Sequence, residues 1–354
     1  MRIDQILPSI SYGDAVSNSA IIIKKMLESK GISSNIYAGH IHPKLRKIVK
    51  PVTKLNNRAD GLLFHMATGS RESYIVKEID IGKKIMIYHN ITPARFFKGY
   101  SSNAERSVIQ GRSELRMLKN DIGLAIGVSE YNRKELEEIG YYNTTVVPFI
   151  VNLDDFAQPP AKNIVKQMQD GKTNILFVGR ISPNKKQEDI IKAFYCYHKF
   201  FNNNSRLTLV GNYTGMEPYY YQLKKLISEL NLENDVLITG HIPFSHILAY
   251  YHTAHLFFSM SEHEGFCVPL LEAMYFKLPI LAYDSSAIGE TLGNGGVLFK
   301  EKDFVKIAAM IDTLIKNEEF NKSYRMKSSS RLEYFKQEKL ESILYSKIIQ
   351  YMNE

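Results

Sequence analysis

Several features that mark secreted, membrane-spanning or cysteine-ligated metal proteins are missing from this sequence of 354 residues. Cys196 and Cys267 are the only cysteines, and their spacing matches no metal-ligand pattern, so we expect two free thiols. No uninterrupted apolar segment reaches about 18 residues, and the first residues carry no signal-peptide pattern. These absences predict a protein that is made and kept in the cytoplasm.

A glycine-rich dinucleotide motif is missing as well. The first expected strand, residues 2–7, is followed by a loop without a G-x-G-x-x-G pattern, which argues against a dinucleotide-binding Rossmann half. The loop instead contains Gly13, where the backbone can approach a ligand closely, and Asp14. Ser17 or Asn18 is expected to cap the helix that follows. An aspartate in such a turn is often only a cap, so Asp14 has a structural as well as a functional interpretation.

One segment of the first domain lacks acidic residues altogether. The net charge is +8, and residues 1–150 contain the whole excess, with 22 basic and 14 acidic side chains. Much of it lies between His42 and Ala59, in Lys44, Arg46, Lys47, Lys50, Lys54 and Arg58. Interleaved with these charges are the apolar residues Leu45, Ile48, Val49, Val52 and Leu55. One interpretation is a face that rests on anionic headgroups, and the other is a solvated basic loop or helix. Nucleic-acid binding is disfavoured because the segment has neither aromatic residues nor a recognition motif.

Continuous apolar strands alternate with helical segments, which predicts an α/β fold with parallel, doubly wound sheets. In the first half, strands are expected over 34–38, 61–66, 84–89, 123–129 and 145–149, with helices over 20–30, 102–119 and 131–139. In such sheets, ligands gather at the carboxyl ends of the strands, where His65 and His89 lie. A histidine in this position is more often structural than catalytic.

The chain is longer than one hydrophobic core usually supports, so two domains are expected. Residues 158–162, Gln-Pro-Pro-Ala-Lys, are rich in turn formers and predict a linker. Later strands are expected over 174–179, 206–211 and 236–240, and helices over 188–200, 218–230, 304–315, 319–334 and 338–352. The predicted domains are 1–158 and 159–335, with a C-terminal helix over 336–354.

The segment 259–274, Ser-Met-Ser-Glu-His-Glu-Gly-Phe-Cys-Val-Pro-Leu-Leu-Glu-Ala-Met, predicts a turn from a strand into a helix. Gly265 permits close approach of the backbone to a ligand, and a proline suits the first helical turn. The backbone N–H groups that point at an anion there belong to Phe266, Cys267 and Val268. Glu264 and Glu272 frame this turn, and carboxylates accept hydrogen bonds from paired hydroxyls. A nucleotide sugar, with sugars on both sides of a phosphate group, suits such a site.

This Glu-x7-Glu segment resembles the signature of retaining glycosyltransferase family 4, whose members have the GT-B fold of two Rossmann-like domains facing a central cleft. The resemblance implies that Glu264 binds hydroxyls of the donor sugar and that Glu272 binds the ribose hydroxyls. Cys267 stands where the family frequently has glycine, and its side chain is expected to narrow the site beside the sugar.

A second segment, Gly179-Arg180-x4-Lys185, resembles the phosphate-binding pattern of the same family. The resemblance implies that Arg180 and Lys185 hold the donor diphosphate, whose negative charge grows as the glycosidic bond breaks. Lys186 occupies a position that is often glycine in the family, and we expect its side chain to be exposed to solvent.

Weaker similarities assign the remaining site residues. By resemblance, Gly13 and Asp14 lie near the donor phosphate and the acceptor, and His89 lies near the transferred sugar. His241 or Ile242 is expected to meet the nucleotide base.

The resemblance implies a hexosyltransferase that needs neither a metal nor a cofactor and retains the anomeric configuration. No catalytic nucleophile is evident, so attack on the same face is expected, with the departing phosphate as base. The basic segment suggests a saccharide or lipid-linked acceptor in surface polysaccharide or glycolipid biosynthesis, with the enzyme in the cytoplasm or peripheral at the inner face of its membrane. The alternatives are a GT-B epimerase or phosphorylase, and a non-catalytic GT-B subunit that stabilises a partner.

Overall fold

The computed structural model describes residues 1–11 and 13–354, so Tyr12, in the loop expected after the first strand, lies outside the described residues. Contacts between residues divide the chain into two compact units. The first consists of Met1–Arg95, Asn103–Asn152 and Phe335–Glu354, and the second consists of Phe96–Ser102 and Leu153–Tyr334. The main chain therefore passes from the first unit to the second at Asn152, near the expected boundary at residue 158.

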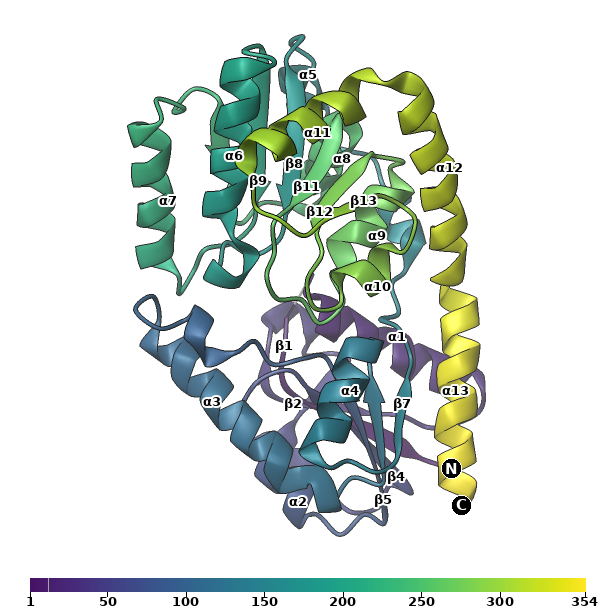
Figure 1. The fold of residues 1–354 in the computed structure, drawn as a ribbon. Helices are drawn as coiled ribbons and strands as arrows, with labels where there is room; N and C mark the ends of the chain where they lie inside the picture. Colours follow the sequence, from purple (N-terminus) through teal and green to yellow (C-terminus); the bar gives the residue numbers. More distant parts are fainter. Residues whose placement is uncertain (12) are drawn as a thin grey trace. The chain divides into compact units, whose positions relative to one another are not determined.

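The first unit contains a parallel seven-stranded sheet in the order β3-β2-β1-β4-β5-β6-β7 (Figure 1). Its strands are β1 (Ile3–Ile10), β2 (Ile36–Ile41), β3 (Val49–Pro51), β4 (Gly61–Met66), β5 (Lys83–Tyr88), β6 (Leu124–Gly127) and β7 (Thr144–Val146). Every residue of β4 is buried, as expected of a central strand with apolar side chains on both faces. The strand expected over 61–66 is confirmed, whereas the first strand continues through Pro8 to Ile10.

The helices of the first unit are α1 (Ala15–Ser29), α2 (Glu72–Glu78), α3 (Ser102–Met117), α4 (Glu130–Ile139) and α13 (Gln337–Asn353). α1 begins five residues before the start expected at residue 20, because Asp14 caps it. The carboxylate of Asp14 accepts a hydrogen bond from Ser17 N at 2.9 Å, so the expectation that Ser17 or Asn18 is the cap was wrong. α13 buries Leu340, Leu344 and Ile348, one residue per helical turn, within this unit.

The second unit contains a parallel six-stranded sheet in the order β10-β9-β8-β11-β12-β13 (Figure 1). Its strands are β8 (Thr173–Val178), β9 (Ser205–Val210), β10 (Val236–Ile238), β11 (Leu256–Ser259), β12 (Ile280–Tyr283) and β13 (Val297–Phe299). Its helices are α5 (Lys162–Met168), α6 (Gln187–Phe200), α7 (Glu217–Glu229), α8 (Phe244–Thr253), α9 (Val268–Tyr275), α10 (Ile288–Leu292), α11 (Phe304–Lys316) and α12 (Glu318–Tyr334). Residues 158–162 were expected to be a linker, but α5 begins at the end of this stretch.

Short 3-10 helices connect several of these elements. They are η1 (Pro43–Leu45), η2 (Val52–Lys54), η3 (Ala94–Phe96), η4 (Leu118–Asn120), η5 (Leu153–Ala157) and η6 (Pro183–Lys185). None of the helices within 1–11 and 13–354 is long and apolar enough to cross a membrane.

Each sheet reverses its strand order once, between β1 and β4 in the first unit and between β8 and β11 in the second. At such a reversal the loops that leave the two strands diverge, which opens a crevice at their carboxyl ends. The loop with Gly13 and Asp14 follows β1, and the loop with Arg180 and Lys185 follows β8. Both loops therefore start at positions where this class of fold binds ligands.

The basic segment of the first unit presents charge rather than an apolar face. All six of its basic residues are exposed. Leu45, Val49 and Val52 point into the protein instead, and the first two pack in the core cluster with Leu7, Ile36 and other residues. Of the interleaved apolar side chains only Ile48 is exposed, so this surface is mainly basic, and its contact with anionic headgroups stays a prediction.

Candidate functional site

Three loops of the second unit meet at the carboxyl ends of β8, β11 and β12. Hydrogen bonds join the first two loops. Glu262 N donates to Asn184 O at 2.8 Å, and the side-chain Nδ2 of Asn184 donates to His263 O at 3.0 Å. Glu264 N donates to Ser286 Oγ at 2.8 Å and so ties the loop after β11 to the loop after β12. These bonds fix the backbone that carries the predicted donor-site residues.

Glycine is required where β8 and β9 end. A Cβ atom at Gly211 would lie 1.9 Å from the carbonyl oxygen of Gly179, closer than any real contact permits. Gly179 itself has φ +155°, and a Cβ there would meet the Phe177 ring at 3.1 Å. Arg180 follows with an exposed side chain, and its guanidinium donates to Thr214 O at 3.0 Å. The close approach of the two glycines thus sets the path of the loop that carries Arg180 and Lys185.

Lys185 and Glu264 form an ion pair at the topological switch point, with Nζ 2.5 Å from Oε2. Their side chains are only 18% and 11% exposed, so water screens the pair weakly. Lys185 ends η6, and Glu264 is held through its backbone by Ser286. The structure therefore brings together a cation and a carboxylate whose sequence positions are far apart.

Glu272 lies on α9, half-buried, and accepts a hydrogen bond of 2.6 Å from the hydroxyl of Tyr251 on α8. Burial raises the pKa of Glu272 to about 7, because removal from water disfavours the charged carboxylate, although the Tyr251 bond acts in the opposite direction. Burial and the neighbouring carboxylate also raise the pKa of Tyr251, which therefore stays a donor. No sequence pattern indicated that Tyr251 contacts Glu272.

α9 begins directly after a left-handed residue. Cys267 has φ +75°, a conformation that glycine adopts more readily than residues with a side chain, which explains why glycine suits this position. Its side chain is buried in the core, and burial raises the pKa of its thiol. Cys267 offers no side-chain cap to the helix, and Pro269 lies in the first turn as expected. No disulfide joins Cys267 to Cys196, as expected from the sequence.

Gly265, Phe266 and Val268 complete the turn between β11 and α9. Phe266 is buried, and its carbonyl accepts a hydrogen bond of 2.6 Å from Thr291 Oγ1. The turn is therefore anchored on the side of α10, and it leads into the first turn of α9.

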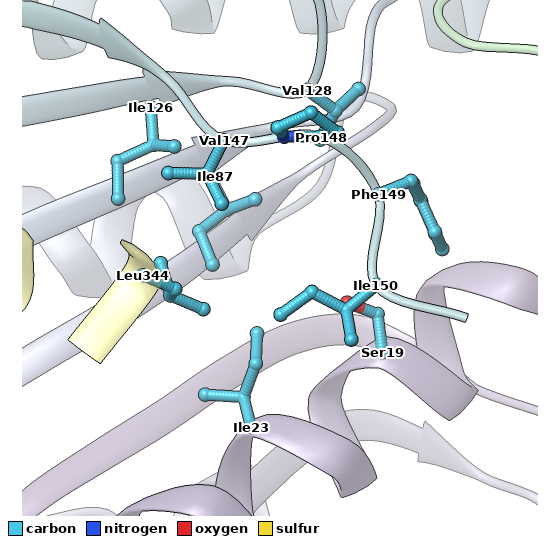
Figure 2. A pocket seen from close by; sticks show the side chains of 10 residues that line it. All are labelled: Ser19, Ile23, Ile87, Ile126, Val128, Val147, Pro148, Phe149, Ile150 and Leu344. Atoms are coloured by element: carbon cyan, nitrogen blue, oxygen red, sulfur yellow. The ribbon is translucent and has the colours of Figure 1, made fainter. Parts of the chain in front are cut away.

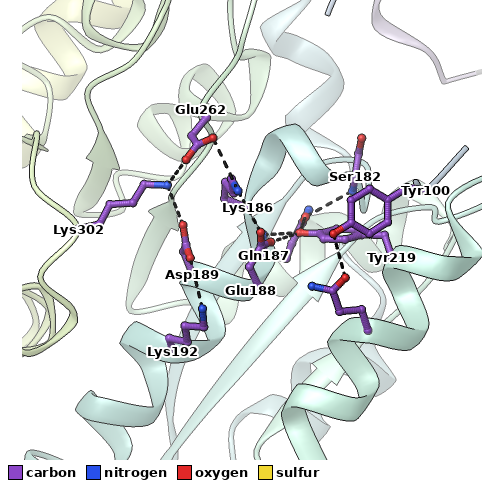
Figure 3. A network of polar contacts seen from close by, with 11 residues as sticks. Tyr100, Ser182, Lys186, Gln187, Glu188, Asp189, Lys192, Tyr219, Glu262 and Lys302 are labelled. Carbon is purple, nitrogen blue, oxygen red and sulfur yellow. Dashed lines mark hydrogen bonds and ion pairs between the residues drawn. The ribbon is translucent and has the colours of Figure 1, made fainter. Parts of the chain in front are cut away.

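Lys186 belongs to a network of charges rather than to the exposed surface (Figure 3). It has φ +54° and is half-buried, with Nζ 3.2 Å from Glu188 and 3.8 Å from Glu262. Lys302 contacts the same Glu262 at 2.5 Å and also Asp189 at 2.7 Å. The expected solvent exposure of Lys186 was wrong, because its ammonium group lies between Glu188 on α6 and Glu262 in the loop after β11.

His241 lies exposed after β10, the edge strand, which β9 separates from β8. Ile242 is half-buried and packs against the core cluster that includes Leu270 and Met274. The backbone before them turns at Gly240, which has φ +69°. Their expected contact with a nucleotide base stays a prediction.

In the first unit, Gly13 has φ +80°, and the Asp14 carboxylate is engaged as the cap of α1. His89 follows β5, with Nε2 3.1 Å from Nδ1 of His65. His65 in turn contacts Gln5, a residue that the sequence analysis did not single out. In the sequence, both histidines stand near the ends of expected strands. The register between β4 and β5 pairs His65 with Ile87, two residues before His89, so their contact could not be read from either segment alone.

The first unit also contains hollows away from the candidate site, among them a pocket of about 260 Å³ lined by Val52, Leu55, Ile75, Glu78 and Ile79. A small cavity in the first unit is lined by nearly all apolar side chains, including Ile87, Phe149 and Leu344 (Figure 2). Its volume of about 10 Å³ is comparable to that of one water molecule, far too small for a sugar. No group of three His, Cys, Asp or Glu side chains within 1–11 and 13–354 is arranged to hold a metal ion.

Comparison with known proteins agrees with this geometry. Residues 161–331 match the family of glycosyl transferases, group 1. The matched stretch covers the Arg180 and Lys185 loop, the turn with Glu264, and α9 with Glu272. It thus contains all four side chains predicted to bind the donor.

Two curated relatives and one solved structure show how far the similarity extends. An alpha-monoglucosyldiacylglycerol synthase from Streptococcus pneumoniae is 26% identical over 50% of this chain and 41% of its own length. O-antigen chain mannosyltransferase B from Escherichia coli is 24% identical over 53% of this chain and 50% of its own length. HepE from Anabaena, solved with UDP-glucose, has a TM-score of 0.77 and 17% identity over 99% of this chain and 100% of that chain.

The structural match, with two parallel α/β units, shows the GT-B fold. The chain spans about half or less of the length of the curated relatives it matches. Together the matches support a group 1 glycosyltransferase.

Proposed function

We propose that this chain transfers a sugar from a nucleoside-diphosphate donor to an acceptor hydroxyl, with retention of the anomeric configuration. The single observation that carries the proposal is the 2.5 Å ion pair between Lys185 and Glu264 at the switch point of the second sheet. It supports the proposal because Lys185 would be the cation for the leaving phosphate, and Glu264 would be the carboxylate for the hydroxyls of the transferred sugar.

The other donor-site residues complete this assignment. Arg180 would supply a second cation after β8. Its exposed guanidinium can pair with two phosphate oxygens at once. Glu272 supplies a carboxylate one helix turn into α9 for the ribose hydroxyls. Backbone N–H groups of the turn at Phe266, Cys267 and Val268 would face the phosphates.

The chemistry of the leaving group explains the role proposed for the two cations. As the glycosidic bond breaks, negative charge accumulates on the diphosphate, and a cation already positioned there stabilises the transition state. Each charge-assisted hydrogen bond contributes about 1.5–3 kcal/mol. Lys185 and Arg180 would supply this stabilisation without a metal ion. The departing phosphate would then take the proton of the acceptor hydroxyl on the same face, and the product would keep the donor configuration.

The acceptor is proposed to be a saccharide or a lipid-linked saccharide in surface polysaccharide or glycolipid synthesis. The S. pneumoniae relative is named as a glycolipid synthase and the E. coli relative as an O-antigen transferase, which supports both classes. The exposed basic residues of the first unit would hold the enzyme against anionic headgroups at the inner face of the cytoplasmic membrane.

A thermal-shift panel tests donor binding directly. UDP, GDP, ADP, dTDP and their common sugars are added with and without Mg²⁺ to the wild type and to Glu272→Ala. Specific binding raises Tm in proportion to RT ln(1 + [L]/Kd), so one nucleotide is expected to stand out without Mg²⁺, and the variant is expected to lose the response. A flat panel would instead favour the non-catalytic subunit that stabilises a partner.

The anomeric configuration is tested separately. NMR of the product would show the same configuration as the donor if transfer is retaining. An inverted linkage would contradict the same-face mechanism, and epimerised or phosphorolysed sugar without a new glycoside would favour the epimerase or phosphorylase alternative.

A further inference from the structure

Three polar side chains form a buried chain across neighbouring strands of the first unit. Gln5 lies on β1, His65 on β4, and His89 one residue past the end of β5. Gln5 Oε1 is 2.9 Å from His65 Nε2, and His65 Nδ1 is 3.1 Å from His89 Nε2. Each contact links two side chains that are fixed by the sheet.

The orientation of the Gln5 amide is determined by a backbone carbonyl. Its Nε2 lies 3.1 Å from the oxygen of Ala20, which can only accept, so the NH₂ group must face that oxygen. The same NH₂ group lies 3.4 Å from Ser34 Oγ. Gln5 Oε1 therefore faces His65, and because this oxygen can only accept, His65 must carry its hydrogen on Nε2.

The assignment continues to the second histidine. Burial lowers the pKa of His65 to about 3, so the ring is neutral and its Nδ1 can only accept. His89 must then donate from Nε2. The ring planes differ by 8°, and the nitrogens at 3.1 Å are much closer than the ring centroids at 5.4 Å, so the rings meet edge to edge in nearly one plane. In that arrangement the N–H points along the lone pair of its acceptor.

The result is an acceptor atom at the end of the sheet. With its hydrogen on Nε2, His89 has a lone pair on Nδ1, and this atom is buried without a hydrogen-bond partner among the described residues. Burial and the neighbouring His65 hold the pKa of His89 well below its usual value, so the ring stays neutral. A buried acceptor without a partner is unfavourable, so a hydroxyl donor on a bound ligand would be stabilised at this atom.

The turn around His89 is held from both sides. Its backbone N donates to Met66 O at 2.9 Å. The next residue, Asn90, has φ +83°, and its side chain donates to Asn132 Oδ1 at 2.9 Å. The ring also lies against Phe149, with centroids 5.3 Å apart. The direction of the free lone pair is therefore set by the fold.

We infer that Gln5 and His65 are positioning residues that fix the tautomer of His89, so that its Nδ1 accepts a hydrogen bond from a hydroxyl of the sugar substrate. This inference rests on the proposed glycosyl transfer. It adds two residues from β1 and β4 that do not touch the substrate. Gln5 determines which nitrogen of the His65 ring carries the hydrogen, and His65 does the same for the His89 ring.

The test combines imidazole ¹⁵N NMR with kinetics on the full-length protein. The variants are Gln5→Met and His65→Phe, which remove the acceptor at each step of the chain while keeping the side-chain size similar. Ser34→Ala is the matched control, because it removes only the longer contact of the Gln5 amide. Cooperative thermal unfolding followed by far-UV circular dichroism reports whether each variant is folded.

In the wild type, both rings are expected to carry hydrogen on Nε2. In Gln5→Met and His65→Phe, the His89 spectrum is expected to become a mixture of tautomers, and kcat/KM is expected to fall about tenfold, the value of one hydrogen bond. Ser34→Ala should stay within about twofold of the wild type.

A wild-type spectrum with hydrogen on His89 Nδ1 would overturn the inference, as would unchanged kcat/KM in both folded variants. If the wild type transfers no sugar, the proposed function and the hydroxyl ligand both fail. The spectra would still decide the tautomer, so the two failures can be told apart.

Discussion

Nζ of Lys185 lies 2.5 Å from Oε2 of Glu264, and both side chains are largely shielded from water. The two residues come from loops that leave β8 and β11, the strands between which the second sheet reverses its order. Two opposite charges are therefore held together where an α/β sheet opens a ligand crevice.

Breaking this pair is expected to affect both stability and turnover. Lys185→Met leaves the Glu264 carboxylate without its partner, at a cost of about 2 kcal/mol in the free energy of unfolding, between the values for surface and buried pairs. kcat/KM is expected to fall at least tenfold, because the leaving phosphate loses a cation. Urea unfolding and donor kinetics measure the two effects.

The double variant Lys185→Met/Glu264→Gln separates these contributions. It should be less destabilised than the sum of the single variants, because neither charge is left alone, while remaining as inactive as either one. Lys192→Met is the control, because its ion pair with Asp189 is 4.0 Å long and its side chain is 44% exposed. Additive losses in stability would mean that the pair is not coupled.

The raised pKa of Glu272 predicts a pH dependence of stability. The folded state holds this proton up to about pH 7, whereas the unfolded chain releases it near the ordinary glutamate pKa of 4.5. Stability is therefore lost as pH rises from about 4.5 to about 7, by about 3 kcal/mol at most, and is level above that range. Glu272→Gln should remove this slope in urea unfolding measured across pH.

We expect the same titration to affect binding of the nucleotide. Ribose hydroxyls donate to a carboxylate, and Glu272 becomes a carboxylate as pH rises through its pKa of about 7. The affinity of the wild type for the nucleotide is therefore expected to rise between about pH 6 and pH 8. Tyr251→Phe removes the bond that lowers this pKa and should move the rise to higher pH. Calorimetric titration at several pH values measures this, and an affinity independent of pH would exclude Glu272 as the ribose ligand.

Gly211→Ala tests the close contact between the ends of β8 and β9. The added Cβ would lie 1.9 Å from the carbonyl oxygen of Gly179, so the loop that carries Arg180 and Lys185 must shift. We expect a loss of about 1–3 kcal/mol in stability, as for other overpacked sites, and weaker nucleotide binding. Gly82→Ala is the matched control, since nothing lies within 4 Å of its Cβ position. Equal stability of the two variants would contradict the geometry.

The exposed basic surface of the first unit predicts binding to anionic vesicles. Changing Lys44, Arg46 and Lys47 to Gln should weaken sedimentation with phosphatidylserine-containing liposomes by about 1 kcal/mol per residue. The same change at Lys225, Lys300 and Lys306, which are 78%, 82% and 72% exposed, is the control for net charge. Equal effects of the two triple variants would show that net charge, and not this surface, attracts the protein to the vesicles. The membrane proposal would be abandoned if the wild type did not bind vesicles and a free oligosaccharide were the best acceptor.

The sequence predicted the parts of the fold that depend on long apolar runs. The strand over 61–66 is an example, because a central parallel strand is apolar on both faces. It did not predict α8, and it did not predict α5, which is short and starts at the end of the stretch 158–162 that was expected to be a linker. The lysine at 186 does not itself indicate φ +54°, whereas the glycine common at this position in the resembled family is consistent with it.

The candidate site was predictable only where one segment carries the pattern. Glu264 and Glu272 stand in such a segment, and so do Arg180 and Lys185. The contact of Glu272 with Tyr251, and the contacts of His65 with Gln5 and His89, depend on which strands and helices become neighbours. Those neighbours come from different parts of the chain, so a pattern within one segment cannot reveal them.

The central claim is that the Lys185 and Glu264 loops bind a nucleotide sugar and release its nucleoside diphosphate. The most direct measurement is release of nucleoside diphosphate from each nucleotide sugar in turn, followed by NMR, with the wild type and Lys185→Met. The account predicts that one donor is consumed by the wild type without added metal, and at least tenfold more slowly by the variant. Release that is equally fast in both proteins, or no release from any donor by a wild type that also binds no nucleotide, would contradict it.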